Sequence, residues 1–423
     1  MASSQRVVLA YSGGLDTSII LRWLIDQGYE VIAFIADVGQ EEDFEAARKK
    51  AFDLGAAEVV VEDLQEELVE HFIYPAIRGN ALYEGRYLLG TAVARPLIAR
   101  AQIDAARRYQ AAYVSHGATG KGNDQVRFEL AYYALAPDIQ VLAPWKMPAF
   151  MQYFQGRADM LAYAEEKGIP ISSSPAKPYS EDDNLLHISH EAGVLEDPGQ
   201  ACEASVYSRT TDPQRAPEKP ERVRLVFEAG RPVALQRDAA AEERPACASA
   251  MMHRLNELAA RHGIGRLDMV ENRFVGIKSR GVYETPGGAL LYEAYRDLEG
   301  LVMDREVLRL RNDLGRRMAD SIYNGFWFAP EMNVLLAATE TATRHLAGWV
   351  ELELYKGRAY PVARGSHWAL YDAQQSSMDE TGDYNPIHAD GLIRLQALRL
   401  QAWQRLHGSR GSARTEATGG RPD

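Results

Sequence analysis

The 423-residue sequence contains only two cysteines, Cys202 and Cys247, and they lie far apart. This spacing excludes a Cys-x-x-Cys metal or redox pair and makes a framework of disulfides implausible. We therefore expect two buried or idle thiols. Although 46% of the residues are hydrophobic, no apolar run approaches the roughly 18 residues that cross a membrane. The sequence thus predicts a protein without a membrane-spanning segment.

Positive charge is also in short supply. Lysine and arginine number 47 against 59 aspartates and glutamates, which gives a net charge of -12. Because neutralisation of phosphates by cations supplies most nucleic-acid affinity, a nucleic-acid partner is disfavoured, although a local basic patch could be hidden in the average. The first residues lead directly into a strand-like run without the regions of a secretory signal. We expect a cytoplasmic protein.

The first part of the chain alternates apolar runs with helical patterns. Such alternation is typical of a parallel sheet covered by helices on both faces. The sequence therefore predicts an α/β, doubly wound parallel-sheet domain over residues 1–170. Strands are expected near residues 7–11, 31–35, 59–61 and 111–115, and helices near 41–54 and 95–109.

The regular alternation ends at a segment rich in proline and serine, residues 169–178, which is typical of a linker. Beyond it, strands and helices mix without fixed order, so we expect an α+β synthetase domain at 171–385 for substrate binding and multimerisation. The helical pattern at 390–406 carries apolar residues on more than one face and predicts a C-terminal oligomerisation helix at 386–407. Residues 408–423 are expected to be disordered.

The strongest motif lies between the first expected strand and helix. Residues 10–18 read Ala-Tyr-Ser-Gly-Gly-Leu-Asp-Thr-Ser. Glycines there let the backbone approach an anion, while hydroxyls and a helix N-terminus supply donors and a favourable dipole. The alternative is a tight turn capped by Asp16 or Ser12. We expect a bound phosphate or pyrophosphate, held by Ser12, Gly13, Gly14, Thr17 and Ser18.

This Ser-Gly-Gly-x-Asp-Thr pattern resembles the phosphate-binding loop of the PP-loop ATP pyrophosphatases. The chain contains neither Gly-x-x-x-x-Gly-Lys-[Ser/Thr] nor a Gly-x-Gly-x-x-Gly that opens the first helix, so a kinase and a dinucleotide-binding fold are disfavoured. The resemblance implies that ATP is cleaved between its α and β phosphates. It also implies an adenylate intermediate that an amine or a sulfur nucleophile then attacks.

A second motif follows the expected strand at 111–115. Residues 116–129 read His-Gly-Ala-Thr-Gly-Lys-Gly-Asn-Asp-Gln-Val-Arg-Phe-Glu. Open α/β sheets place their ligands after such strands. Thr119, Asn123 and Asp124 offer polar groups that could bind an amino acid, and Arg127 offers a fork for a carboxylate. The alternative is a flexible loop followed by a helix that Asn or Asp caps.

Together with segments 83–91, 94–100, 270–276 and 278–288, this motif resembles the argininosuccinate synthase family, and the similarity extends from Val7 to Leu406. That family is a carbon-nitrogen ligase of arginine biosynthesis that joins citrulline and aspartate at the expense of ATP. The resemblance implies that the ureido oxygen of citrulline is adenylated. The aspartate amine then displaces AMP.

The resemblance also implies which residues bind each substrate. Contacts to ATP would come from Ala10, Tyr11, Ser12, Gly13, Gly14, Leu15, Asp16, Thr17, Ser18, Ala36 and Gly117. Aspartate would be held by Thr119, Asn123 and Asp124. Citrulline would be held by Tyr87, Asn123, Arg127, Ser180, Ser189, Glu271 and Tyr283, with Thr91 as a further substrate contact.

Asp16 and Asp124 are the candidates for a catalytic role. Mg²⁺ is expected to arrive with ATP and to keep several waters, and these two carboxylates are candidates for its coordination shell. Asp124 could also remove the proton from the attacking amine, and a substrate or phosphate oxygen is an equal candidate. His187 and His190 suggest a metal pair, but no third ligand has useful spacing, so ordinary loop residues are favoured.

Two positions depart from the family pattern. Ala92 stands where the family has serine, so we expect a missing hydroxyl at the citrulline site, and Glu293 stands where the family usually has histidine. These changes leave open a paralogue that acts on another ureido compound. A tRNA-thiolating enzyme shares the loop but is disfavoured by the two distant cysteines and the negative charge. A nucleotide sensor without turnover is also open, and the family implies a homotetramer.

Overall fold

The computed structural model describes residues 5–120, 122–170, 179–238, 240–377, 385 and 387–408. The chain through Ala369 forms one compact unit, and the residues from Leu370 onward form another. Over these described ranges, no helix combines the length and the apolar character that a membrane crossing requires. The expected linker segment 171–178 and the expected disordered tail from residue 409 lie outside the described residues.

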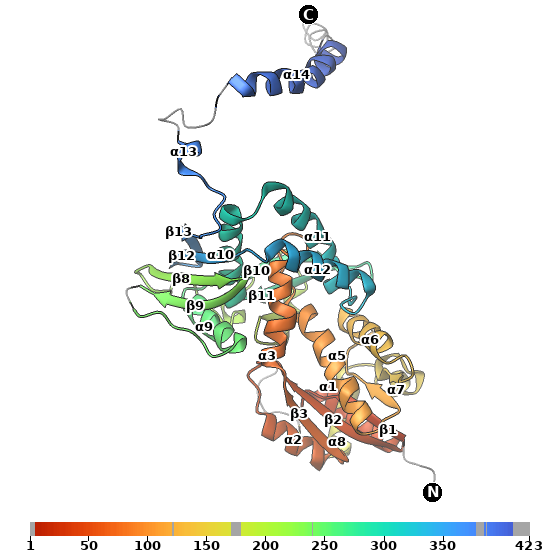
Figure 1. Ribbon diagram of the computed structural model, residues 1–423. Helices are drawn as coiled ribbons and strands as arrows, with labels where there is room; N and C mark the ends of the chain where they lie inside the picture. Colours follow the sequence, from red (N-terminus) through yellow and green to blue (C-terminus); the bar gives the residue numbers. More distant parts are fainter. Residues whose placement is uncertain are drawn as a thin grey trace, which may run out of the picture. The chain divides into compact units, whose positions relative to one another are not determined.

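The N-terminal part is built on a parallel sheet of five strands in the order β3-β2-β1-β4-β5 (Figure 1). Its strands are β1 (Gln5–Ala10), β2 (Tyr29–Asp37), β3 (Glu58–Asp63), β4 (Tyr113–Ser115) and β5 (Gln140–Leu142). The expected strands are thus confirmed. Because β1 pairs with β2 on one side and with β4 on the other, the strand order reverses at β1. In open α/β sheets, ligands bind at the carboxyl ends of the strands beside such a reversal.

Helices cover both faces of this sheet, which explains why its strands are continuous apolar runs. Val7 and Leu9 pack with residues of α1 (Leu15–Asp26), α7 (Pro148–Tyr153) and α8 (Arg157–Glu166). Val8 points to the opposite face and joins the core that contains residues of α5 (Gly90–Arg108) and α6 (Asn123–Leu135). This doubly wound arrangement confirms the predicted fold class. A further helix, α2 (Phe44–Asp53), connects β2 to β3.

Helix α5 begins at Gly90 rather than near Arg95, where the sequence predicts its start. Gly90, Thr91 and Pro96 are poor helix formers in isolation. Nevertheless, most of the helix is buried on all sides, so packing overrides the local preference. Its first turn therefore belongs to a helix that the sequence pattern alone does not reveal.

Beyond residue 170 the chain forms two antiparallel sheets, as expected for an α+β region. The first has the order β10-β11-β7-β6 and the second has the order β13-β12-β8-β9. The strands of the first are β6 (Ser180–Asp183), β7 (Ile188–Glu191), β10 (Arg266–Asn272) and β11 (Lys278–Glu284). The strands of the second are β8 (Glu221–Glu228), β9 (Arg231–Arg237), β12 (Gly348–Tyr355) and β13 (Arg358–Gly365).

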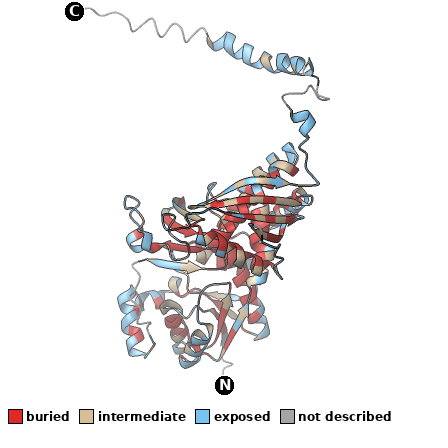
Figure 2. Ribbon diagram, turned by 90° about the vertical axis from the view of Figure 1, so that its left-hand side faces the viewer, coloured by how far each residue is buried: buried red, intermediate tan, exposed pale blue. Residues whose placement is uncertain are grey.

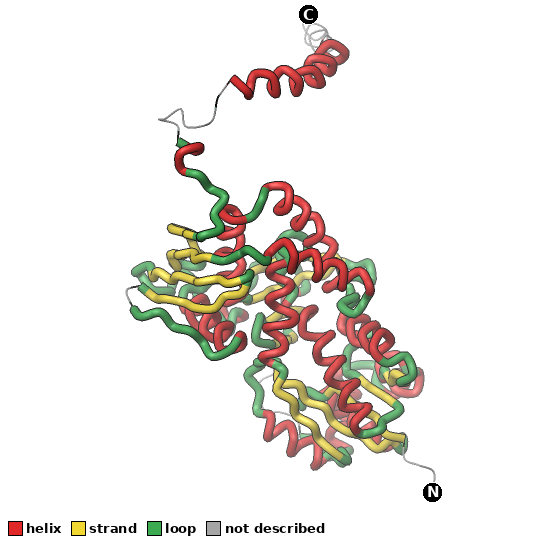
Figure 3. The backbone as a smooth tube through the Cα atoms, in the orientation of Figure 1, coloured by secondary structure: helices red, strands yellow, loops and turns green. Residues whose placement is uncertain are grey.

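Helical segments lie between the parallel sheet and the antiparallel sheets (Figure 3). They include α3 (Gln65–Leu68), a π-helical turn at Val69–Ile73 and α4 (Tyr74–Arg78), which run together ahead of α5. The other helices of this unit are α9 (Ala248–Arg261), α10 (Pro286–Val302), α11 (Arg305–Tyr323) and α12 (Pro330–Thr343). One large hydrophobic core extends from β1 and α5 to α10 and β12, so the parallel and antiparallel sheets share buried contacts.

The second unit contains α13 (Ala373–Ser376) and α14 (Ile387–His407). The helix expected at 390–406 is therefore confirmed. No described residue of α14 is buried, as Figure 2 shows by its colouring. The exposed apolar side chains of this helix are Ile387, Leu392, Ile393, Leu395, Leu398, Leu400, Trp403 and Leu406.

A buried amide joins α5 to both neighbouring strands of the sheet. Gln102 has no exposed surface, and its Nε2 donates hydrogen bonds to the carbonyl oxygens of Val8 and Ser115, each at 2.8 Å. Its Oε1 accepts one from the Tyr132 hydroxyl at 2.5 Å. This single side chain thus ties β1, β4 and α6 to one helix.

We expect Gln102→Leu to lower the free energy of unfolding by about 3 kcal/mol, because it leaves two carbonyls and a hydroxyl without a partner. Urea unfolding followed by circular dichroism measures the change. The control is Gln155→Leu at an exposed position, which should alter stability by less than about 0.5 kcal/mol. Equal effects of the two substitutions would show that the buried network does not stabilise the fold.

Candidate functional site

A cleft with a volume of about 1100 Å³ opens at the carboxyl ends of β1, β2 and β4. Ala10, Ala36 and Gly117 follow or end these three strands and line its floor. The opposite wall comes from the antiparallel sheet of β6, β7, β10 and β11. The cleft therefore lies where an open α/β sheet places a ligand, with groups from the second sheet facing it.

The glycine-rich turn at residues 12–14 leads into α1 without a side-chain cap. Gly13 has φ +73°, and a Cβ there would meet the Ala47 Cβ at 3.1 Å, so this position requires glycine. The N-cap residue is Gly14, and among the described side chains none caps the helix. Ser12 Oγ accepts a hydrogen bond from the Gly14 N–H at 3.4 Å, and the Asp16 carboxyl bonds its own backbone N–H, so both residues of the alternative take some part in the turn. The remaining N–H groups at the start of α1 are available to an anion.

The hydroxyls of the turn bond to one another. Ser12 Oγ lies 3.1 Å from Thr17 Oγ1, and Ser18 Oγ lies 3.1 Å from the Tyr11 hydroxyl. Lys50 Nζ, which sequence reasoning missed, donates to the Gly13 carbonyl at 2.8 Å. The turn is thus fixed in shape and has a cation beside it, as an anion-binding site requires.

Gly117 and Asp16 complete the floor around this turn. Gly117 must be glycine, because a Cβ there would meet Thr17 Cγ2 at 2.8 Å. The loop after β4 can therefore lie against the start of α1. Asp16 lines the cleft, and burial raises the pKa of its carboxyl, although its own backbone N–H and Arg157 act in the opposite direction.

The loop after β4 brings Asp124 between two arginines. Arg95 Nε donates to Asp124 Oδ2 at 3.0 Å, and Arg127 Nη1 donates to Asp124 Oδ1 at 2.8 Å. Burial raises the pKa of this carboxyl, but the two guanidinium groups outweigh burial and lower it to about 2. Asp124 is thus a carboxylate with little affinity for a proton. This environment disfavours the role of general base and favours a role in binding.

Helix α6 begins without the Asn or Asp cap that the sequence suggests as an alternative. Its N-cap is Gly122, and no side-chain cap is found among the described residues. Asn123 instead accepts a hydrogen bond from the Phe274 N–H at 3.1 Å. Its amide therefore connects α6 to the loop between β10 and β11.

Three tyrosines surround the buried carboxylate of Glu271. The Tyr283 hydroxyl donates to Glu271 Oε2 at 2.8 Å, and the Tyr323 hydroxyl donates to Oε1 at 2.5 Å. Tyr87 stacks on Tyr283 with ring centroids 4.2 Å apart. Burial raises the pKa of Tyr283 and Tyr323 well above the usual range, so both remain donors to the carboxylate. This cluster forms an aromatic wall of the cleft that holds the carboxylate of Glu271.

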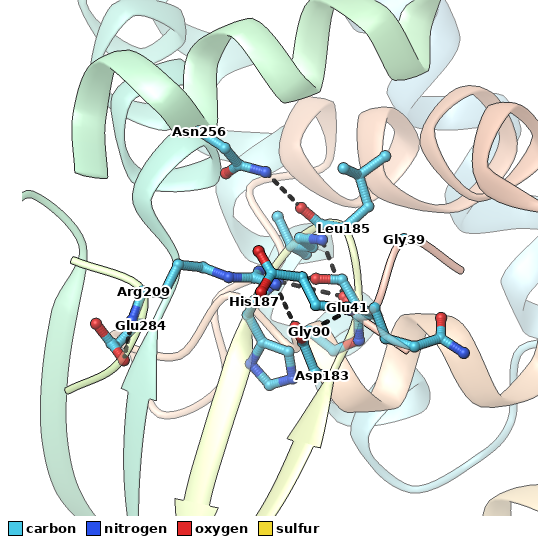
Figure 4. Close-up of polar contacts among 12 residues, drawn as sticks. Gly39, Glu41, Gly90, Asp183, Leu185, His187, Arg209, Asn256 and Glu284 are labelled. Atoms are coloured by element: carbon cyan, nitrogen blue, oxygen red, sulfur yellow. Dashed lines mark hydrogen bonds and ion pairs between the residues drawn. The ribbon is translucent and has the colours of Figure 1, made fainter. Parts of the chain in front are cut away.

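The hairpin turn between β6 and β7 is held by three other parts of the chain (Figure 4). The Leu185 N–H donates to the Val38 carbonyl at 2.7 Å, and the Asn256 side chain donates to the Leu185 carbonyl at 2.7 Å. Asn184 Nδ2 donates to the Gly90 carbonyl at 3.1 Å. The hairpin therefore fixes Ser180 and Ser189 relative to β2 and α5.

The structure brings most of the predicted site residues into this one cleft. Those that line it are Ala10, Tyr11, Ser12, Asp16, Thr17, Ala36, Tyr87, Thr91, Gly117, Thr119, Asn123, Asp124, Arg127, Ser180, Ser189, Glu271 and Tyr283. Four members of the predicted turn do not contribute to its lining, namely Gly13, Gly14, Leu15 and Ser18. Their predicted contacts to ATP would have to come from the backbone or from a shift of the turn.

The two departures from the family pattern do not lie at the cleft surface. Ala92 is only 1% exposed and belongs to the hydrophobic core, and Glu293 is on α10. Neither residue lines the cleft. Ala92 is next to Thr91, which does line the cleft, and the expected missing hydroxyl at the citrulline site stays a prediction.

Sequence reasoning missed several charged residues of the lining, namely Arg95, Asp182, Asp183, Glu191, Arg209 and Arg273. Arg95 and Arg273 lie in segments 94–100 and 270–276, which contribute to the resemblance to the family. The resemblance did not assign a binding role to either arginine. Arg95 Nη2 bonds Asp182 Oδ2 at 2.6 Å, and Arg273 pairs with Glu191 at 2.5 Å. Such pairs join segments far apart in sequence, so spacing along the chain could not reveal them.

No metal centre is found in the described ranges, since no group of three or more His, Cys, Asp or Glu is arranged to hold an ion. His187 Nε2 contacts Thr91 Oγ1 at 2.9 Å, whereas His190 Nε2 contacts Glu284 at 3.0 Å. The two imidazoles thus have different partners. Cys202 is half-buried and Cys247 is exposed, so of the two expected alternatives, buried or idle, burial does not apply to Cys247.

Burial raises the pKa of the Asp183 carboxyl from 3.8 to about 6, although the positive charge of Arg209 acts in the opposite direction. Because the folded state binds this proton more tightly than the unfolded chain, ionisation costs stability as pH rises from about 4 through about 6. We expect Asp183→Asn, which cannot ionise, to remove this cost. The free energy of unfolding of the variant minus that of the wild type should therefore be about 2 kcal/mol more positive at pH 7 than at pH 4.5. The variant thus gains stability over the wild type as pH rises.

Urea unfolding at the two pH values measures this difference. The control is Asp138→Asn at an exposed position, for which the difference from the wild type should be the same at both. If Asp183→Asn behaves like that control, burial does not raise the pKa of Asp183.

Comparison with known proteins agrees with this architecture. The family description "Arginosuccinate synthase N-terminal HUP domain" matches residues 6–170, and "Arginosuccinate synthase C-terminal domain" matches residues 179–403. The argininosuccinate synthase of Thermotoga sp. (strain RQ2) is 53% identical over 402 residues, which cover 95% of this chain and 98% of the relative. The mouse and human proteins of the same name are each 50% identical over 406 residues, covering 96% of this chain and 98% of each relative. The chain therefore belongs to the argininosuccinate synthase family.

Proposed function

We propose that this protein joins citrulline and aspartate to form argininosuccinate through a citrullyl-adenylate, with release of AMP and pyrophosphate. This is a carbon-nitrogen ligase reaction of arginine biosynthesis. Membership of the family supports it. The observation that carries it is the cleft itself, in which an uncapped helix N-terminus and a set of amino-acid-binding groups face one space.

The ATP phosphates are assigned to the turn at residues 12–18. A polyphosphate is suited by the fixed hydroxyls, by the N–H groups at the start of α1 and by Lys50. At Gly13 and Gly117, a Cβ would collide with neighbouring side chains. The rest of the nucleotide is assigned to Ala36, near the end of β2, and to Gly117, which follows β4. Mg²⁺ is proposed to arrive with ATP and to bind chiefly through phosphate oxygens and water, with Asp16 beside it.

Citrulline is assigned to the wall opposite the turn. Glu271 and Arg127 supply opposite charges for an amino acid, and Tyr87, Thr91, Asn123, Ser180, Ser189 and Tyr283 supply neutral polar groups. The Arg127 guanidinium is fixed by a hydrogen bond from Nε to the Tyr323 carbonyl at 2.9 Å. This arrangement would direct the ureido oxygen toward the α phosphorus. Pyrophosphate then leaves along the turn.

Aspartate is assigned to Thr119, Asn123 and Asp124, which lie between the nucleotide turn and the citrulline wall. Asp124, held as a carboxylate by Arg95 and Arg127, would accept hydrogen bonds from the incoming amine and orient it. The proton of that amine would pass to a substrate or phosphate oxygen. Holding three substrates in line is a large source of rate, worth up to roughly 7 to 11 kcal/mol.

The assembly and location are part of the same proposal. The exposed apolar side chains of α14 support a role in oligomerisation, and we propose a cytoplasmic homotetramer without a nucleic-acid partner. We also propose the division into an ATP-binding domain at 1–170, a synthetase domain at 171–385 and an oligomerisation helix at 386–407. The net charge of -12 supports small-molecule substrates over RNA.

Oxygen labelling tests the adenylation step. When citrulline carries ¹⁸O in its ureido group, we expect the label to appear in AMP, because that oxygen forms the bond to the α phosphorus. Pyrophosphate should form only with both ATP and citrulline present, and argininosuccinate only when aspartate is added. Mass spectrometry of AMP reports the label. Unlabelled AMP during turnover would contradict the adenylate, and accumulation of ADP would contradict cleavage at the α phosphorus.

The role of Asp124 predicts a split between the two half-reactions. We expect Asp124→Asn to lower kcat/KM for aspartate by about 10- to 100-fold, the cost of losing charged hydrogen bonds. Exchange of pyrophosphate into ATP, which needs only citrulline, should fall much less. Asp104→Asn on α5, whose side chain is exposed, is the matched control. Equal losses in exchange and ligation would show that Asp124 does not act on aspartate.

A further inference from the structure

A buried histidine lies directly behind the proposed citrulline wall. His187 has no exposed surface and does not line the cleft. Its Nε2 lies 2.9 Å from Thr91 Oγ1. The Thr91 N–H donates to the Tyr87 hydroxyl at 3.3 Å, and both Thr91 and Tyr87 face the cleft. Thr91 therefore lies between His187 and the cleft.

The ring of His187 is fixed on several sides. It lies 5.9 Å from the Tyr283 ring at 19° and 6.0 Å from the Tyr87 ring at 37°. A Cβ on Gly90 would meet the imidazole at 2.1 Å, so only glycine at the start of α5 admits the ring. Figure 4 shows His187 beside Gly90 below the hairpin turn. The imidazole cannot rotate freely without moving the aromatic wall.

Burial and charge keep this imidazole neutral. Burial lowers the pKa of His187 well below its usual range, and the positive charges of Arg209, Arg95, His190 and Arg127 act in the same direction. A neutral imidazole carries its proton on one nitrogen only. The position of that proton decides which way the hydrogen bond to Thr91 runs.

The second ring nitrogen shows where the proton lies. Nδ1 is buried and finds no hydrogen-bond partner within the described ranges. A buried N–H without an acceptor is rarer and more costly than an unused lone pair. The proton therefore belongs on Nε2, which donates to Thr91 Oγ1. Thr91 must then direct its own hydroxyl proton away from His187.

We propose that His187 is a positioning residue whose Nε2–H sets the direction of a hydrogen-bond chain through Thr91. Because Thr91 Oγ1 accepts from His187, the Thr91 hydroxyl presents a donor, not a lone pair, to an acceptor oxygen of the citrulline. The Tyr87 hydroxyl accepts from the Thr91 backbone N–H, independently of His187. A donor on this side complements the Glu271 carboxylate, which can only accept. This inference rests on the proposed function, and it adds a residue that determines how the site distinguishes oxygen from nitrogen on its substrate.

Kinetics of His187 variants test the role. We expect His187→Phe, which retains a ring but removes the donor, to raise KM for citrulline by about 2- to 10-fold, the effect of one hydrogen bond. KM for ATP should stay unchanged. His187→Gln, which can donate an amide N–H to Thr91, should restore most of the affinity. The matched control is His262→Phe, because His262 is also buried, with an Nδ1 that has no partner among the described residues, but its Nε2 contacts Glu221, which does not line the cleft.

Thr91→Val provides the second arm. If His187 acts through Thr91, His187→Phe should change KM for citrulline by less than about 2-fold in a Thr91→Val background, because interacting residues are not additive. Full additivity would overturn the proposal, and so would an unchanged KM for citrulline in His187→Phe. A fall in kcat without a change in KM for citrulline would also overturn it.

Nitrogen NMR of the intact protein makes the test independent of activity and of variant folding. In protein labelled with ¹⁵N-histidine, His187 should show a protonated Nε2 and an unprotonated Nδ1 between pH 6 and pH 8. A protonated Nδ1 would overturn the proposal. If the wild type shows this tautomer but makes no argininosuccinate, the proposed function fails while the hydrogen-bond direction stands. If the wild type is active and His187→Phe is indistinguishable from it, only the inference about His187 fails.

Discussion

The site depends on one partly buried guanidinium, that of Arg95, which joins its two walls. Arg95, on α5, bonds Asp124 of α6 at 3.0 Å and Asp182 of β6 at 2.6 Å. Charge-assisted hydrogen bonds of this kind are strong, and because Arg127 also pairs with Asp124, the four groups form one network. The bridge connects the parallel sheet to the antiparallel sheet at the point where substrates are proposed to meet. Groups from both sheets therefore line a single cleft.

Close packing of the backbone supplies the second constraint. At Gly39, φ is +89° and a Cβ would meet Leu185 Cβ at 2.7 Å. Only glycine at this position therefore lets the loop after β2 lie against the β6–β7 hairpin. Gly90 admits His187 in the same way. Leu89, with φ +64°, turns the chain immediately before α5. Strained or glycine-dependent positions thus gather around the cleft, as is common where a site must be held in one shape.

The sequence predicts the parts of this protein that depend on local pattern. Apolar runs predict the parallel strands, and the glycine turn predicts a phosphate site, because both signals occupy consecutive residues. The resemblance predicts residues as distant as Tyr87, Asp124 and Glu271, which the fold brings to one cleft. Ion pairs such as Arg95 with Asp182 were not predictable, because strand order decides them. The burial of Ala92 was not predictable for a related reason, since sequence does not show which face of α5 is buried.

The central claim is that one cleft holds the nucleotide and both amino acids at once. A crystal structure with citrulline, aspartate and an ATP analogue that resists cleavage between its α and β phosphates tests it most directly. We expect the phosphates at residues 12–18, citrulline against Tyr87 and Glu271, and aspartate at Asp124, with the ureido oxygen facing the α phosphorus. Phosphates bound away from that turn, or an amino acid bound outside the cleft, would contradict the account.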